Sequence, residues 1–426
     1  MNWFSMSLFA CLAALGAAAG LDFDSPFPGE LDHPAIEYAT RPEHNAVSEL
    51  NARLQEGKIR LEYEGTPGYL RSVLEALNVP IESQIMVFSK TSLQQRIISP
   101  TNPRTLFFND SVAVGWVPGE PFVEVAADDP QQGAIFYTLE QSPSVSPKFI
   151  RRDGCLQCHE DYATLGVPGM LVRSVFAAPD GTAMRPRGEF VTDHRSPFAQ
   201  RWGGWYVTGK TGALPHMGNL TFANGGEAER ISKGADLDSL ETKFKTSSYL
   251  SAYSDIVALL VFNHQMRMIN LLTRVGWEVR FAGYGENAGK PAERSALLRD
   301  AAHEVADYML FVDEAPLRGR IQGTSGFTEI FSGQGPRDTR GRSLRQFDLE
   351  RRLMRYPCSY MIYSPAFDGL PGEAKAAIYQ RLWQILSGEE RAPKYGRLST
   401  ADRRAVLEIL RETKSGLPDY FRAAAI

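Results

Sequence analysis

Residues 105–140 read "TLFFNDSVAVGWVPGEPFVEVAADDPQQGAIFYTLE". The apolar runs at 105–110, 111–117, 122–127 and 134–140 are rich in Val, Phe and Ile, and Asn-Asp, Pro-Gly and Gly punctuate them. β-Branched and aromatic residues favour strands, and the intervening residues favour turns. The stretch therefore predicts a succession of β-strands joined by short turns.

The same pattern continues on both sides of this stretch. Apolar runs at 85–89, 170–176, 188–192 and 204–209 predict further strands, and Pro-Asp-Gly at 179–181 predicts a hairpin turn. Two helices are expected before the first strand, at 44–57 and 66–80. Gly57 suits the end of the first helix, and Thr66 with Pro67 suits the start of the second.

From about Ser247 onward the apolar residues recur with helical spacing. The segment 254–275, "SDIVALLVFNHQMRMINLLTRV", carries an apolar stripe over about five turns. Helical patterns follow at 293–312, 343–355, 373–388 and 399–412, with a Gly- and Arg-rich loop at 318–343. We therefore predict an α+β protein, with a β-rich domain at 20–230 and a helical domain at 231–426.

The composition is that of a globular protein with no charge bias. The chain has 426 residues, of which 43% are hydrophobic and 23% charged, and 46 basic residues nearly balance 50 acidic ones. A net charge of −4 gives no sign of a nucleic-acid partner or of binding to an anionic membrane. We also find no protease, hydrolase or nucleotide-binding motif.

The start of the chain has the shape of a secretory signal. Residues 1–20, "MNWFSMSLFACLAALGAAAG", contain no charged residue, and an apolar run leads into small residues. We predict a signal peptide at 1–19, cleaved after Ala19 or Gly20, although the usual positive start is missing. The run is too short to remain as a membrane span, so no stable transmembrane segment is expected after cleavage. Lipid attachment through Cys11 is a minor alternative.

The motif with the clearest chemistry is "CLQCH" at residues 155–159. Cys155 and Cys158 lie one helical turn apart, and His159 follows directly. One short helix can therefore offer two thiols for thioether bonds to haem and an imidazole for its iron. Export removes Cys11, so Cys358 is left as a single thiol that we expect to be buried and reduced. The sequence predicts one covalent haem c.

Other interpretations of the motif were weighed. A zinc site would need a second C-x-x-C or an H-x-x-x-H partner, and the chain has neither. A redox dithiol does not require the trailing histidine. A chance occurrence is the third alternative. Export and the trailing histidine together favour haem over all three.

The second axial ligand of the iron is left open. His216 is the first candidate, because it follows a strand in a Pro-His-Met-Gly-Asn loop. Met217 and His194 are the alternatives, together with an open or water-bound position. Met170 is close to the anchor along the chain, and we expect His264 to serve helix packing. A histidine ligand would lower the reduction potential relative to methionine, and an open position would allow ligand binding.

The segment "RWGGWYVTG" at 201–209 lies between two of these candidates. Trp202 and Trp205 can supply flat apolar area against a porphyrin, or they can belong to an ordinary core. Arg201, like Arg173 and Arg195, can pair with a haem propionate or serve elsewhere.

Several segments together carry a family resemblance. These are "VFSKTSLQ", "GVPGM", "VTDHRSP", "RWGGWYVTG" and "HMGN" around CLQCH, and "RYPCSYMIYSPAFDGLP" near the end. The chain resembles a group of exported bacterial proteins described as cytochrome c domain-containing, over most of its mature length. The resemblance implies haem binding and electron transfer in the periplasm, and it implies no substrate or partner.

The sequence favours a periplasmic mono-haem c-type cytochrome that carries single electrons to or from a redox partner protein that we cannot name. The alternatives are a haem oxidoreductase of peroxidase type and a haem-based sensor, either of which would have an exchangeable distal position. The sequence favours the carrier over the enzyme. It defines neither the reduction potential nor the oligomeric state.

Overall fold

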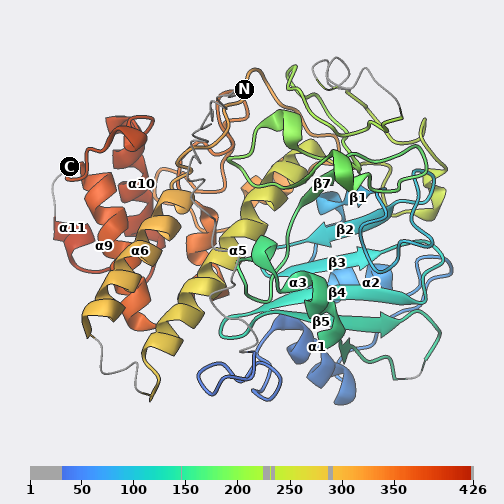
Figure 1. Ribbon diagram of the computed structural model, residues 1–426, viewed down its shortest axis with the longest axis horizontal. Helices are drawn as coiled ribbons and strands as arrows, with labels where there is room; N and C mark the ends of the chain where they lie inside the picture. The colour runs from blue at the N-terminus through green and yellow to red at the C-terminus, as the bar shows by residue number, and fades with distance from the viewer. Residues whose placement is uncertain (1–30, 145, 224–230, 232–235, 286–290, 424–426) are drawn as a thin grey trace, which may run out of the picture.

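The computed structural model describes residues 31–144, 146–223, 231, 236–285 and 291–423 (Figure 1). The predicted signal peptide and Cys11 lie outside these residues. An antiparallel sheet occupies the first half of the chain, and helices dominate the second half. The predicted α+β class is confirmed at this level.

Seven strands form the main sheet, in the order β6-β5-β4-β3-β2-β1-β9, and every neighbouring pair is antiparallel. All the predicted strand regions contain a strand. The strands are β1 (Ile85–Val87), β2 (Arg104–Phe108), β3 (Val112–Trp116), β4 (Phe122–Asp129), β5 (Gly133–Glu140), β6 (Ile150–Arg151) and β9 (Trp205–Tyr206).

A separate hairpin pairs β7 (Arg173–Val175) with β8 (Glu189–Val191). The predicted Pro-Asp-Gly turn is present just after β7. Gly181 has φ +89°, which favours glycine, and Ala178 and Thr182 are hydrogen bonded across the turn.

The two faces of the sheet pack against different helices. One face packs against α1 (Ala46–Gln55) and α2 (Leu70–Ala76), where Asn45 donates to the Tyr137 hydroxyl over 2.9 Å. On the other face, directly paired residues form a row of Leu106, Gly115, Glu124 and Thr138. Paired residues of antiparallel strands point to the same side, so this row marks the second face.

The long helix α5 (Ile256–Ala282) lies along this second face (Figure 1). The ring of Phe262 on α5 lies 4.9 Å from that of Phe108, and Gln265 donates to the backbone oxygen of Asn109 over 2.6 Å. By length and composition α5 is the one described helix that could cross a membrane, yet most of it is buried inside the protein. A helix that is apolar on most sides belongs in a core of this kind.

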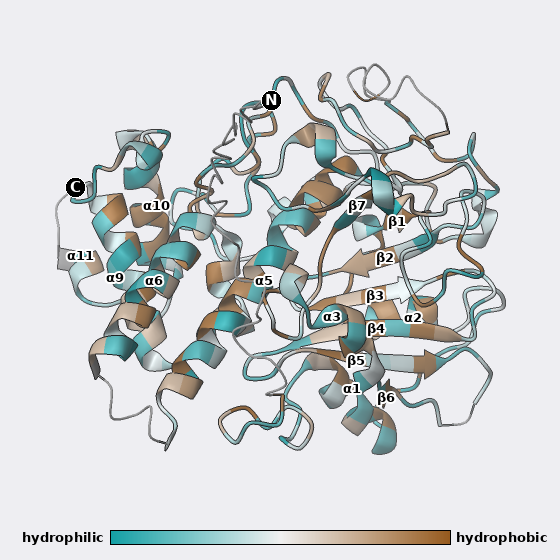
Figure 2. Cartoon of the chain, in the orientation of Figure 1, coloured by the Kyte–Doolittle hydropathy of each residue, from teal (hydrophilic) through white to brown (hydrophobic). Residues whose placement is uncertain are grey.

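The helical half adds α6 (Pro291–Met309), α7 (Phe327–Gly333), α8 (Pro365–Asp368), α9 (Gly372–Ser387), α10 (Thr400–Thr413) and α11 (Tyr420–Ala423). In Figure 2, α9 and α10 alternate between hydrophilic and hydrophobic residues, as amphipathic helices do. Buried side chains of both halves belong to one contiguous hydrophobic cluster.

Helix starts follow the local sequence in most places. Ser399 and Asp402 form a capping box at the start of α10. Gly57 follows the end of α1 with φ +68°. The predicted start at Thr66 and Pro67 is wrong, because α2 begins at Leu70 without a side-chain cap. The helix expected at 343–355 is also absent, and this segment contains turns and one β-bridge.

Candidate functional site

Two short helical elements carry the motif CLQCH. A 3₁₀ turn, Asp153–Cys155, leads directly into α3 (Leu156–His159). Leu156 is buried and anchors the turn, Cys155 is half-buried and Cys158 is exposed. Both thiols are free. The turn thus presents two thiols and one imidazole on one short helical segment.

Hydrogen bonds attach this turn to the edge of the sheet. The backbone nitrogen of Arg152 donates to the Phe136 oxygen on β5 over 2.8 Å, and its guanidinium donates to the Thr138 hydroxyl over 2.9 Å. In Figure 1, α3 lies in front of the strands β3 to β5. Thr138 belongs to the row that marks the second face, so the motif stands over that face.

The imidazole of His159 is held in one orientation. Its Nδ1 lies 2.9 Å from the Gly169 carbonyl oxygen, and the Gly169 nitrogen donates to the His159 carbonyl over 2.9 Å. The ring also lies 4.7 Å from that of Phe136. Burial lowers the pKa of His159, so the ring is neutral at neutral pH. A carbonyl can only accept, so Nδ1 carries the proton and Nε2 is left with its lone pair.

Helix α5 holds the residue that follows Gly169. Asn270 accepts from the Met170 nitrogen over 3.2 Å and donates to the Met170 oxygen over 2.8 Å. A side chain at position 169 would overlap the amide of Asn270, so glycine is required for this close approach. The carbonyl that orients His159 is therefore fixed from a helix about 100 residues away in the chain.

The donor groups of the motif do not converge on a single point. Among the described residues, no group of three or more His, Cys, Asp or Glu side chains is arranged to hold a metal ion. A zinc site made of Cys155, Cys158 and His159 would require such convergence. A haem c does not, because the thiols bond to porphyrin carbon and only the imidazole reaches the iron.

The face of the sheet beside the motif carries a glycine and an ion pair. Arg104 and Glu124 form an ion pair of 2.5 Å across Gly115, where a side chain would overlap the guanidinium. Burial, with Glu124 nearby, raises the pKa of Cys155 to about 11, so this group is a neutral thiol. Trp205 pairs with Val87, which pairs with Arg104, and therefore lies on the same face at its far edge.

The other sequence candidates gather in a second cluster around α5. Trp202 is fully buried and donates to Asn263 of α5 over 2.8 Å, and its ring lies 5.5 Å from that of His216. Met217 is buried too, with its nitrogen bonded to the Arg201 oxygen over 3.0 Å. The structure thus brings the distal candidates near one another.

His216 has two unpartnered ring nitrogens. It is fully buried, and neither Nδ1 nor Nε2 has a hydrogen-bond partner among the residues that the structure describes. Burial lowers its pKa to about 4. Met217, in contrast, accepts a hydrogen bond from Ser174 over 3.9 Å. His194 shares the feature in part, because its Nε2 is buried without a described partner, but its Nδ1 is bonded to His264. Buried imidazole nitrogens without partners are costly, so the two open nitrogens favour His216 as the ligand candidate.

The structure does not bring His216 against His159. Trp202, next to His216, is bonded to Asn263 of α5, and Met170, next to Gly169, is bonded to Asn270. These two positions on α5 are seven residues apart, which spans about 10 Å. Two nitrogens on one metal ion lie about 4 Å apart, twice a typical metal–nitrogen bond. Shared coordination would therefore require the loop of His216 or the turn of His159 to move.

His194 has a structural role in a buried chain of hydrogen bonds. Its Nδ1 lies 2.7 Å from Nδ1 of His264, whose Nε2 lies 2.7 Å from the Ser359 hydroxyl. All three residues are buried, and Tyr308 stacks on His264. His264 packs within the core as predicted.

The arginines chosen from the sequence already have partners. Arg201 is fully buried and donates to the backbone oxygens of His194 and Ser196. Arg173 is paired with Glu189. Arg195 is paired with Asp193 over 2.6 Å.

The sequence pattern gave no indication of a role for Arg267, a cation near the motif. Arg267 on α5 makes no hydrogen bond or ion pair to any residue that the structure describes, and its Nε is buried. It interrupts the apolar stripe of 254–275, but one arginine in an amphipathic helix is ordinary and carried no signal by itself.

Comparison of the chain with protein-family models, with curated proteins and with solved structures gave no match.

Proposed function

We propose that the protein is a c-type cytochrome with one covalent haem, which carries single electrons in the periplasm. The observation that carries the proposal is the orientation of His159 by Gly169 beside two free thiols on the same turn. Iron-ligating histidines commonly donate their second ring proton to a backbone carbonyl, which fixes the tautomer.

The residues present fit this group. Cys155 and Cys158 would each add a thiol across one vinyl group, forming a C–S bond and a C–H bond, so that nothing else is consumed. His159 would bind through Nε2. The bound haem would supply reversible one-electron chemistry at its iron.

The chain contributes orientation and shielding. Gly169 holds the proton on Nδ1 of His159, and Phe136 packs against the ring. Gly115 leaves room for the Arg104–Glu124 ion pair on the adjacent face of the sheet, and Trp205 lies on the same face. The predicted export signal supports a periplasmic location, where two thiols and a haem are joined by dedicated maturation proteins.

Haem staining after denaturing electrophoresis tests the proposal. Wild-type protein produced with haem c maturation proteins is expected to keep its stain, and the Cys155→Ala/Cys158→Ala double variant is expected to lose it. Cys358→Ala is the matched control, because this buried thiol lies outside the motif and its variant should stain normally. A wild-type protein without stain would refute covalent haem attachment.

A haem oxidoreductase or sensor is the second candidate. The observation that favours it is the separation of the surroundings of His216 and His159 along α5, which leaves the sixth position of the iron without an assigned ligand. Carbon monoxide separates the two: rapid binding to the reduced protein would indicate an exchangeable position, and no binding would indicate a closed six-coordinate carrier.

A further inference from the structure

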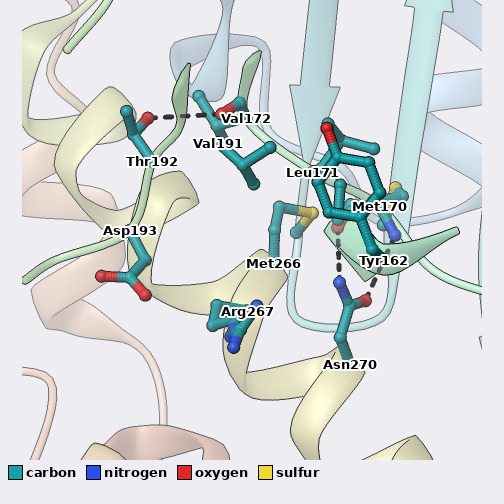
Figure 3. A pocket seen from close by; sticks show the side chains of 11 residues that line it. Tyr162, Met170, Leu171, Val172, Val191, Thr192, Asp193, Met266, Arg267 and Asn270 are labelled. Atoms are coloured by element: carbon teal, nitrogen blue, oxygen red, sulfur yellow. Dashed lines mark hydrogen bonds between the residues drawn. The ribbon is translucent and has the colours of Figure 1, made fainter. Parts of the chain in front are cut away.

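The cavity of about 170 Å³ lies between three segments of the chain (Figure 3). Tyr162 follows α3 and stands at its edge with 65% of its surface exposed. Residues 170–172 and 191–193 flank the β7–β8 hairpin, and α5 supplies the remaining side. The volume equals that of about six water molecules at ~30 Å³ each, which suits a small occupant.

The lining is apolar on one side and charged on the other. Met170, Val172 and Met266 offer apolar surface. Arg267 lies on the α5 side between Asp193 and Asn270 in Figure 3. The polar atoms of Asn270 are already bonded to Met170, so they are occupied. A ligand with a short apolar part and one polar end matches this division.

Arg267 is the polar group of the cavity that has no partner. Its Nε is buried, and the side chain forms no hydrogen bond or ion pair within the described chain. Burial lowers the pKa of Arg267, and Asp193 opposes this effect. A guanidinium stays protonated in proteins, so the cavity is lined by a half-buried positive charge whose buried Nε has no partner among the described residues.

The carboxylates that face Arg267 are bonded to other arginines. Arg195 engages Asp193 through its backbone nitrogen over 2.7 Å and its guanidinium over 2.6 Å. Glu304 also faces Arg267 and lies 3.5 Å from Arg274, which is paired with Glu278 as well. Neither carboxylate forms an ion pair with Arg267 among the described residues, so its guanidinium is available to an anionic ligand.

We propose that this cavity binds a small monocarboxylate, with Arg267 receiving the carboxylate and the methionine side receiving a short alkyl chain. A planar guanidinium can donate two parallel hydrogen bonds to a carboxylate, which suits a single buried arginine.

The site has a physical connection to the haem motif. Met170 lines the cavity and is bonded to Asn270, and the residue before it supplies the carbonyl that orients His159. A carboxylate that displaces Met170 would alter the hydrogen bond at Nδ1. Binding is therefore expected to shift the reduction potential, and this part of the inference rests on the proposed function.

Calorimetric titration with acetate, propionate and butyrate tests the site in two forms of the protein, the holoprotein and the haem-free Cys155→Ala/Cys158→Ala variant. Both forms are expected to bind the carboxylates, and neither should bind propionamide, which has the same shape without charge. Arg267→Gln is expected to weaken binding about tenfold or more. Arg267→Lys should retain part of it.

Arg274→Gln is the matched control. It removes an arginine of the same helix that is paired with Glu278 over 2.7 Å and does not line the cavity. Equal loss in both glutamine variants would overturn the assignment to Arg267. If Arg267→Gln fails to fold, the Arg267→Lys variant and the comparison of propionate with propionamide test whether Arg267 binds the carboxylate.

Three outcomes would overturn the proposal: no carboxylate binding in either form, equal binding of propionamide, or binding only in the haem-free form. The last result would assign Arg267 to a haem propionate. Failure of the proposed function is distinguishable, because a wild-type protein without haem could still bind carboxylates at Arg267.

Discussion

The Nδ1 atom of His159 lies 2.9 Å from the carbonyl oxygen of Gly169. This single contact fixes the tautomer of the imidazole and leaves Nε2 available for a metal ion. The contact depends on Asn270, which binds both the nitrogen and the oxygen of Met170. The electronic state of the proposed iron ligand is thus set by a side chain on α5.

Replacing Asn270 by alanine is expected to raise the reduction potential. A weaker hydrogen bond at Nδ1 makes the imidazole less basic and stabilises ferric iron less. We expect a rise of roughly 40 mV, which corresponds to ~1 kcal/mol for one electron, in a spectroelectrochemical titration. Stability should fall by about 2 kcal/mol, because two buried backbone groups lose their partner.

Asn263→Ala is the matched control for that experiment. Asn263 is a buried amide on the same helix that binds Thr192 and Trp202 instead. It should cost similar stability and leave the potential unchanged. Equal potential shifts in both variants would show that α5 acts through general loosening and not through Gly169.

Distal coordination can be assigned with single histidine variants of the holoprotein. His216→Ala is expected to convert a low-spin absorption spectrum into a high-spin one that reacts with carbon monoxide, because neither ring nitrogen of His216 has a partner among the residues that the structure describes. His194→Ala is expected to leave the spectrum unchanged, because Nδ1 of its ring is bonded to His264 in the buried core. The reverse pattern would transfer the role to His194, and no change in either would favour Met217.

Cys358 is expected to be inert in the folded protein. The residue is fully buried, as predicted from the sequence, and burial raises the pKa of its thiol to about 12. A thiol reagent should label the native holoprotein slowly. Unfolding should then expose one further thiol equivalent to the reagent. Rapid labelling of the native Cys155→Ala/Cys158→Ala variant would contradict this, since only Cys358 of the described cysteines would remain.

The pH dependence of stability should include a contribution from Asp128. Burial, with Asp129 nearby, raises the pKa of this carboxyl to about 8, and its Oδ1 has no hydrogen-bond partner in the described part of the chain. The folded state therefore holds a proton that the unfolded chain releases near pH 4. The protonated carboxyl therefore stabilises the folded state fully below pH 4. This stabilisation is lost as the pH rises towards 8.

Asp128→Asn is expected to remove that dependence. Thermal unfolding should show the variant gaining a few kcal/mol of stability relative to wild type between pH 5 and pH 9, at ~1.4 kcal/mol for each pH unit of the affected range. Asp419→Asn at an exposed position is the control and should follow the wild-type curve. A constant difference between Asp128→Asn and wild type across this range would show that Asp128 is ionised in the folded protein.

The strand series, the long helix and the attachment turn were predictable because each rests on local spacing. The runs at 85–140 became strands β1 to β5, and most of 254–275 lies within α5, which begins at Ile256. Two local expectations failed. Thr66 and Pro67 lie before α2, and 343–355 is not helical, because helical spacing by itself does not guarantee packing of an apolar face.

By itself, the sequence of residues 155–159 placed two thiols and an imidazole on one turn, since three-residue spacing determines their relative positions. Only the tertiary structure decided that Gly169 orients His159, that Asn270 secures this segment and that Arg267 lines a cavity without a partner among the described residues. The contact of Asn270 with Met170 joins residues 100 positions apart, and a free arginine is recognised only when all its neighbours are known. Spacing along a chain carries no information about such distant contacts, because packing of the complete core creates them.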